Sequence, residues 1–194
     1  MAMRIISGYA KGMKLKTAKG RAVRPTGDRV KEGIFSVLGD LTGAVVVDLF
    51  AGCGGLGIEA VSRGAGAVHF IEKARSHVRI IGANLDKLKA CFPADNPAET
   101  RVIQGDALTV HVRLASLNGK VDVVFADPPY RPERGESGPE TVLESEALRK
   151  WIGDGILVLE HAKVTPLDFK ARGWRLLKQK TYGDTAVSFA QVDD

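Results

Sequence analysis

Residues 48–57 read Asp-Leu-Phe-Ala-Gly-Cys-Gly-Gly-Leu-Gly and lie between a short apolar run, 44–49, and a segment with helical spacing, 56–63. Glycine lets a turn tighten and lets a ligand approach the backbone closely. A glycine-rich turn that leads from a buried strand into a helix is typical of doubly wound α/β folds. The stretch therefore predicts an α/β domain with a ligand at this turn.

The strand–helix alternation continues along the chain. Continuous apolar strands separated by helices predict a parallel sheet that is covered on both faces. Two final strands are joined through Tyr182-Gly183-Asp184, which is a hairpin signal. The pattern adds up to a mostly parallel, seven-stranded sheet. The expected strands are 44–49, 68–71, 100–104, 121–126, 155–160, 174–181 and 186–192, and the expected helices are 56–63, 74–89, 107–117 and 140–151.

The N-terminal segment differs from the rest in pattern. Residues 4–17 predict a β-hairpin that turns near residues 9–12, with lysines alternating with apolar residues. Such a ribbon is stable only when it is docked on a larger body. We therefore expect an arm over residues 1–23 and one domain over residues 24–194.

A helix is expected just after this arm. An apolar stripe begins at Val30, and Thr26 or Asp28 is suited to cap its N-terminus. Gly39 or Gly43 is expected to end it.

Composition narrows the class of protein. The hydrophobic fraction of 44% and the charged fraction of 26% are globular values. No apolar run is long enough for a membrane span, and no signal-peptide pattern opens the chain. The two cysteines and four histidines have no metal-ligand spacing, so no metal is expected. These features suit the cytoplasm.

The positive charge is concentrated near the N-terminus. Residues 1–40 hold nine lysines and arginines against three acids, a net charge of +6, whereas the remaining 19 basic and 20 acidic residues give −1. A basic arm on a nearly neutral body suggests a polyanionic partner.

The glycine pattern by itself leaves two cofactors open. Gly52-x-Gly54-x-x-Gly57, with Glu72 twenty residues after Gly52, also fits a dinucleotide-binding fingerprint and hence a nicotinamide cofactor. Asp48 would repel a pyrophosphate but could bind a cationic amino-acid group. Glu72 could accept hydrogen bonds from two ribose hydroxyls, and Asp106 from an adenine amino group, although Asp106 also resembles a helix cap. These acids fall at the carboxyl ends of successive strands and favour S-adenosylmethionine.

A second motif follows the strand 121–126. Asp127-Pro128-Pro129-Tyr130 places a carboxylate, a rigid backbone carbonyl and an aromatic ring together where the strand ends. The prolines cannot donate ladder hydrogen bonds, so the strand stops there. Ligands of open α/β sheets bind at this edge.

These motifs resemble those of class I S-adenosylmethionine-dependent methyltransferases, and residues 127–130 match the branch that methylates amino groups. From residue 4 to about 190, the chain is similar to the RsmD family of bacterial 16S ribosomal RNA guanine-N2 methyltransferases. Ser7, Cys53 and Gly55 depart from that family's pattern, which has Gly, Ser and Ala there, and the segment 11–15 departs from its Gly-Arg hairpin sequence. The similar segments are Arg4-Ile-Ile-Ser-Gly, Arg24-Pro-Thr-Gly-Asp-Arg-Val-Lys-Glu, Asp48-Leu-Phe-Ala-Gly and Ser62-Arg-Gly-Ala.

The resemblance implies a Rossmann-like methyltransferase fold and assigns roles to residues. Asp127, Pro128 and Pro129 would hold the N2 amine of an extruded guanine, and Tyr130 would stack on that base. Thr26 and Arg29 could instead cover the methionine end of the cofactor. The residues expected to bind S-adenosylmethionine are Asp48, Phe50, Ala51, Gly52, Gly54, Gly57, Glu72, Lys73, Asp106, Ala107 and Thr26. Those expected to bind RNA are Lys11, Lys14, Lys16, Arg21, Arg24 and Arg29.

The implied partner is 16S ribosomal RNA within small-subunit particles, bound by a monomer. Three other activities remain open at this point. One is methylation of adenine N6 or of a protein glutamine, one is a nicotinamide oxidoreductase, and one is an RNA-binding module without catalysis.

Overall fold

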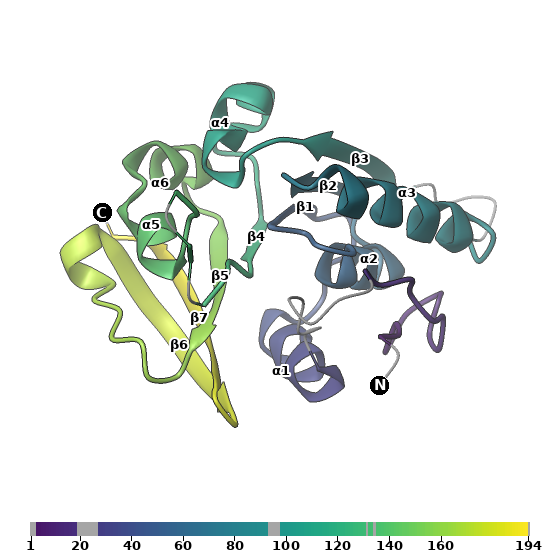
Figure 1. Ribbon diagram of the computed structural model, residues 1–194, viewed down its shortest axis with the longest axis horizontal. Helices are drawn as coiled ribbons and strands as arrows, with labels where there is room; N and C mark the ends of the chain where they lie inside the picture. The colour runs from purple at the N-terminus through teal and green to yellow at the C-terminus, as the bar shows by residue number, and fades with distance from the viewer. Residues whose placement is uncertain (1–2, 19–26, 93–97, 131, 134, 194) are drawn as a thin grey trace.

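The computed structural model describes residues 3–18, 27–92, 98–130, 132–133 and 135–193. Its seven-stranded sheet has the order β3-β2-β1-β4-β5-β7-β6 (Figure 1). β1 to β5 are parallel, whereas β7 runs antiparallel to both β5 and β6, as the hairpin signal predicted. The strands are β1 (Val45–Leu49), β2 (Ala67–Glu72), β3 (Glu99–Gln104), β4 (Val123–Ala126), β5 (Ile156–Ala162), β6 (Trp174–Tyr182) and β7 (Thr185–Val192).

Helices cover both faces of the sheet, as the apolar strands predicted. One hydrophobic core lies between the sheet and α1 to α3, and the other lies between the sheet and α4 to α6. The first group comprises α1 (Asp28–Leu38), α2 (Gly55–Ser62) and α3 (Arg75–Lys89). The second comprises α4 (Val110–Arg113), α5 (Pro139–Glu144) and α6 (Glu146–Ile152), with the short 3₁₀ turns η1 (Ala107–Thr109), η2 (Ala115–Leu117) and η3 (Lys170–Arg172).

Side chains of a strand alternate between the two faces. On β1, Val46 belongs to the core under α1 to α3, while Val47 and Leu49 belong to the other core. Asp48 is therefore directed to the side of α2, although it is an acid inside an apolar layer. This placement puts a carboxylate beneath the glycine-rich turn.

Two expected helices are each divided. The segment 107–117 forms η1, α4 and η2, and the segment 140–151 forms α5 and α6. Ser145 separates α5 from α6 because its extended backbone ends the first helix and its Oγ caps the second by accepting from the Leu148 amide at 3.3 Å. The apolar periodicity was right, but it does not reveal such breaks.

The expected cap of α1 was wrong. The cap position is Gly27, which has an extended backbone, and no side chain of the described residues caps the helix. Asp28 is the first helical residue, and its Oδ2 accepts from Arg4 Nε at 2.9 Å. Thr26 lies outside the described residues. Gly39, one of the two expected stops, ends the helix with φ 75°.

The arm (Figure 1, purple) contributes buried side chains to the core that it shares with α1 to α3. Its two sides run antiparallel: Arg4 is bridged to Lys14, and the amides of Ile5 and Leu15 donate to the carbonyls of Met13 and Met3, each at 2.9 Å. The Ser62 hydroxyl accepts from the Ala10 amide at 2.9 Å, and the Ser62 carbonyl accepts from the Tyr9 amide at 2.8 Å. A Cβ at Gly8 would lie 1.6 Å from the Ser62 carbonyl oxygen, so this approach to α2 requires glycine. Whether residues 1–23 form a separate unit stays a prediction.

A buried ion pair fixes the arm further. Glu59 of α2 accepts from the amides of Ile6 and Ser7 at 2.8 and 3.0 Å. The buried Lys31 of α1 lies 3.7 Å from Glu59 and donates to the carbonyl of Arg4. Burial lowers the pKa of Lys31, although the Glu59 carboxylate opposes that change. These contacts join the arm, α1 and α2 into one packed layer.

In the described part of the chain, no helix is long and apolar enough to cross a membrane.

Candidate active site

The carboxyl ends of β1 to β5 form one edge of the sheet, and the predicted site residues gather there. Leu49 pairs with Ala126 and with Ile71, so Phe50, Asp127 and Glu72 are level with one another at this edge. β1 lies between β2 and β4 in the sheet. The chain leads from β1 to β2 on one side, whereas β4 is the neighbour of β1 on the other side. Ligands of open α/β sheets bind at such a switch in strand order.

The turn between β1 and α2 has an unusual backbone. Phe50 has φ 57°, a left-handed conformation that costs free energy in a residue with a side chain. Gly52 and Gly54 have φ 56° and 81°, which glycine adopts freely. Among the described residues, a Cβ at Gly52 would have only the Phe50 carbonyl oxygen within 4 Å, at 3.9 Å. The backbone at Gly52 is thus open to a ligand.

Asp48 supports this turn through a buried hydrogen bond to the first turn of α2. Its Oδ2 accepts from the Gly57 amide, in the first turn of α2, at 2.9 Å, and the residue is 3% exposed. Gly57 must lack a side chain, because a Cβ would lie 2.3 Å from the ring of Phe70. Burial raises the pKa of Asp48 to about 8; the Glu72 carboxylate adds to the rise, and the Gly57 hydrogen bond opposes it. A cationic group placed beside Asp48 would favour its ionised form.

Glu72, at the end of β2, holds the same turn from the side. Its two carboxylate oxygens accept from the amides of Gly52, at 2.8 Å, and Ala74, at 2.7 Å. The Ala51 amide also donates to the Ile71 carbonyl of β2 at 3.1 Å. A carboxylate has about four acceptor sites, so Glu72 retains capacity for ribose hydroxyls.

Asp106 follows β3 at the next position along the edge. Its Oδ1 caps the turn η1 by accepting from the Leu108 amide at 2.9 Å. Its Oδ2 lies 4.0 Å from Lys73 Nζ, and Ala107 beside it is buried. The cap interpretation of Asp106 is correct, and it leaves the partly exposed Oδ2 side available to a ligand.

The motif 127–130 follows β4. Pro128 is buried, Pro129 is exposed, and Asp127 and Tyr130 are half-buried. The Tyr130 hydroxyl donates to Glu160 Oε1 at 2.7 Å and lies 3.0 Å from Thr185 Oγ1. Burial, followed by the Glu160 carboxylate, raises the pKa of Tyr130 well above its usual value, so the phenol stays protonated. The ring is therefore held from β5 and β7.

The family model described as "Conserved hypothetical protein 95" matches residues 3–191 of this sequence. The chain belongs to this family.

Named relatives agree with this assignment and with the predicted RsmD resemblance. A Bacillus subtilis protein, named as a proposed rRNA methyltransferase, is 34% identical over 96% of this chain and 97% of its own. The ribosomal RNA small subunit methyltransferase D of Haemophilus influenzae is 33% identical over 93% of this chain and 89% of its own. A solved Escherichia coli structure, of a proposed methyltransferase, superposes with a TM-score of 0.70 at 30% identity, covering 100% and 99% of the two chains. The fold is that of class I methyltransferases.

This family member exposes the described basic residues that were assigned to RNA. Lys11, Lys14 and Lys16 are exposed on the arm, while Met13 and Leu15 between them are buried. Arg29 is exposed in the first turn of α1. Arg21 and Arg24 lie outside the described residues. The alternation in the arm thus presents lysines outward, as its sequence pattern predicted.

Sequence reasoning missed three residues of this site: Glu160 and Thr185, which hold the Tyr130 hydroxyl, and Asn84 of α3, whose side chain donates to the Cys53 carbonyl of the glycine-rich turn at 3.0 Å. Glu160 is the only one with a signal, since it comes near the end of a predicted strand, as Asp48 and Glu72 do. Thr185 and Asn84 have no local pattern. The fold of this family member alone brings them to the site.

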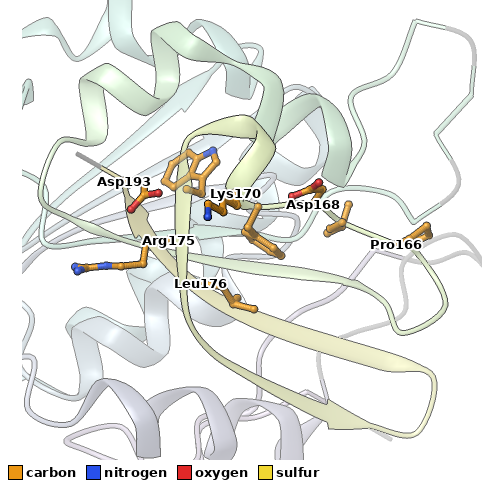
Figure 2. A pocket seen from close by; sticks show the side chains of 9 residues that line it. Pro166, Asp168, Lys170, Arg175, Leu176 and Asp193 are labelled. Carbon is orange, nitrogen blue, oxygen red and sulfur yellow. The ribbon is translucent and has the colours of Figure 1, made fainter.

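A shallow depression lies away from this edge, beside the first residues of β6 (Figure 2). Its volume is about 570 Å³, and its lining includes Lys170, Trp174, Arg175, Leu176 and Asp193. Trp174 pairs with Val192, at the end of the β6–β7 hairpin that is remote from Tyr130. The depression is therefore not part of the candidate active site. Among the described residues, no three acids, histidines or cysteines gather as a metal site would require.

Proposed function

We propose that this protein transfers a methyl group from S-adenosylmethionine to the exocyclic N2 amine of a guanine in 16S ribosomal RNA, within the small ribosomal subunit or its precursors. The observation that carries the proposal is the alignment of the glycine-rich turn with Asp127 at one sheet edge, in a chain related to rRNA methyltransferases. This alignment supports a reaction in which a cofactor bound at the turn would lie beside an amine bound by Asp127. A non-catalytic RNA-binding module would need neither.

The residues at the edge fit the cofactor. S-adenosylmethionine supplies an electrophilic methyl group when it is bound. The open backbone at Gly52 suits a close ligand, and the buried Asp48 suits a cationic amino-acid group. Glu72 and Asp106 lie along the same edge, where they would bind ribose and adenine. A nicotinamide oxidoreductase would leave the motif 127–130 without a role.

Asp127 and Pro128 would activate the amine. The lone pair of guanine N2 is delocalised into the ring, which makes the nitrogen a poor nucleophile. A carboxylate and a backbone carbonyl that accept hydrogen bonds from its two N–H groups would draw the nitrogen towards a tetrahedral geometry. They would also offset the positive charge that develops on the nitrogen during the transfer. As the new N–C bond forms, the S–C bond to the methyl group would break with its electron pair left on sulfur. The nitrogen would then carry a positive charge and be acidic, so it could lose its proton to water after the transfer and Asp127 need not be a strong base. Tyr130 would stack on the base, a contact worth roughly 1–3 kcal/mol.

The choice of substrate is tested by supplying labelled S-adenosylmethionine with unmodified 16S and 23S ribosomal RNA, each free and in partly assembled particles. We expect label in 16S RNA alone. Label that resists ribonuclease and stays with protein would favour a glutamine methyltransferase. Label in 23S RNA would contradict the proposed substrate.

Loss of the Tyr130 hydroxyl should slow transfer. We expect Tyr130→Phe to lower kcat by about 5–10-fold, because the ring loses the bonds to Glu160 and Thr185 that fix it. Glu160→Gln, which can still accept from the phenol, should have a smaller effect. A double variant no slower than Tyr130→Phe alone would show that Glu160 acts through the hydroxyl. Additive losses would contradict this role.

The arm should supply the salt-dependent part of RNA binding. Reversing the charges of Lys14 and Lys16 to Glu should lower RNA affinity and reduce the slope of log K against log salt by about 2, about one per lost phosphate contact. Lys170→Glu with Arg175→Glu, at the remote depression, makes the same change in net charge and should leave the slope unaltered. An equal reduction of the slope in both double variants would show that the arm is not part of the RNA interface.

A further inference from the structure

The glycine-rich turn is held from two sides. β2 holds its first half, through Ile71 and Glu72, as described above. Its second half, Cys53 to Gly55, contacts the arm and α3. The arm therefore reaches the turn that forms the cofactor side of the candidate active site.

Asn84 of α3 makes the central contact. Its side chain is fully buried and accepts from the Lys16 amide at 2.8 Å. The same side chain donates to the Lys16 carbonyl and to the Cys53 carbonyl, each at 3.0 Å. One amide oxygen and one NH₂ group thus satisfy one donor and two acceptors, which fixes the orientation of the amide. Asn84 links the arm to the turn through backbone groups alone.

Met3 makes a second contact between the arm and the turn, in which the Cys53 thiol donates to the Met3 thioether. Its Sδ lies 3.2 Å from Cys53 Sγ, and both side chains are buried. A Cβ at Gly55 would lie 2.7 Å from Met3 Sδ. The end of the Met3 side chain thus packs directly against the backbone of Gly55.

We infer that the arm is a structural support of the cofactor site, and that Asn84 is its positioning residue. Preorganised backbone groups bind a ligand without the cost of ordering them. Lys16 presents its charged end to solvent while Asn84 holds its backbone, so one segment serves both the RNA side and the cofactor side. The inference rests on the proposed function only in assigning S-adenosylmethionine to the turn at residues 52–57.

The test measures the affinity for S-adenosylmethionine by calorimetry, without RNA, at a temperature well below the unfolding transition. Asn84→Ala should weaken the affinity by about 5-fold or more, because the Cys53 carbonyl loses its partner. Leu88→Ala removes a buried side chain one turn further along α3 and is the matched control. It should lower the unfolding temperature at least as much and change the affinity less than twofold.

Equal changes in affinity for Asn84→Ala and Leu88→Ala, or none for Asn84→Ala, would overturn the inference. Met3→Ala should weaken the affinity in the same direction, and it decides the question if Asn84→Ala does not fold. An unaltered affinity in Met3→Ala would then overturn the inference. Failure of the wild-type protein to bind S-adenosylmethionine would instead count against the proposed function.

Discussion

Asp127→Ala should lower kcat for methyl transfer by about 10²–10³-fold, the loss typical of removing one group that stabilises charge in a transition state. The affinity for S-adenosylmethionine should change less than threefold. Asp127 follows β4, whereas the acids assigned to the cofactor lie at or just after the carboxyl ends of β1, β2 and β3. Steady-state kinetics with RNA, together with calorimetry of the cofactor, separates the two quantities.

Asp193→Ala is the control for this result. It removes the same charge from an exposed position in the lining of the remote depression. Its kcat should equal that of the wild type. Comparable losses of kcat and of cofactor affinity in Asp127→Ala would mean that Asp127 belongs to the cofactor side of the site.

Asp48→Asn should weaken S-adenosylmethionine binding by about 10–100-fold, because a charged hydrogen-bond partner of the amino-acid group is lost. The free protein should become more stable. Asparagine can still accept from the Gly57 amide, and it removes a carboxyl whose ionisation burial opposes. A gain of 1 kcal/mol would raise Tm by roughly 2–4 °C in a domain of this size.

The pH dependence of this variant has a definite sign. The pKa of Asp48 is raised from 3.8 to about 8 on folding. The contribution of Asp48 to the free energy of unfolding is complete below pH 3.8 and is lost as the pH rises through about 8. The difference in stability in favour of Asp48→Asn should therefore grow over that range. Cofactor affinity of the wild type should rise towards pH 8, because the ionised form binds the cation, and that of the variant should not.

Asp122→Asn is the matched control for Asp48. Its carboxylate also accepts from a backbone amide, that of Val45 at 2.7 Å, but at the amino end of β1. It should leave both the affinity and its pH dependence unaltered. Equal cofactor binding by Asp48→Asn and the wild type would contradict the role of Asp48.

Much of the candidate site could be predicted because its residues follow strands. Apolar runs mark β1, β2 and β4, and parallel strands bring their carboxyl ends to one edge. Asp48, Glu72 and Asp127 therefore had to lie near one another once the strands were recognised. The hairpin at residues 182–184 was predicted from its turn residues, whereas the order of the strands was not predicted.

Contacts between distant segments could not be predicted in this way. Asn84 is a polar residue on the apolar face of a helix, and nothing near it in the sequence indicates Lys16 or Cys53 as its partners. The departure of Gly55 from the family pattern was visible in the sequence. Met3, whose side chain packs against Gly55, lies 52 residues away and could not be identified as its neighbour. Helix breaks such as Ser145 depend on a local balance between capping and periodicity, which apolar spacing does not report.

The most direct test identifies the methylated nucleoside. 16S ribosomal RNA from the reaction with labelled S-adenosylmethionine would be digested to nucleosides, separated and identified by mass spectrometry. The account predicts label in N2-methylguanosine, absent from the Asp127→Ala reaction. Label in N6-methyladenosine would contradict it.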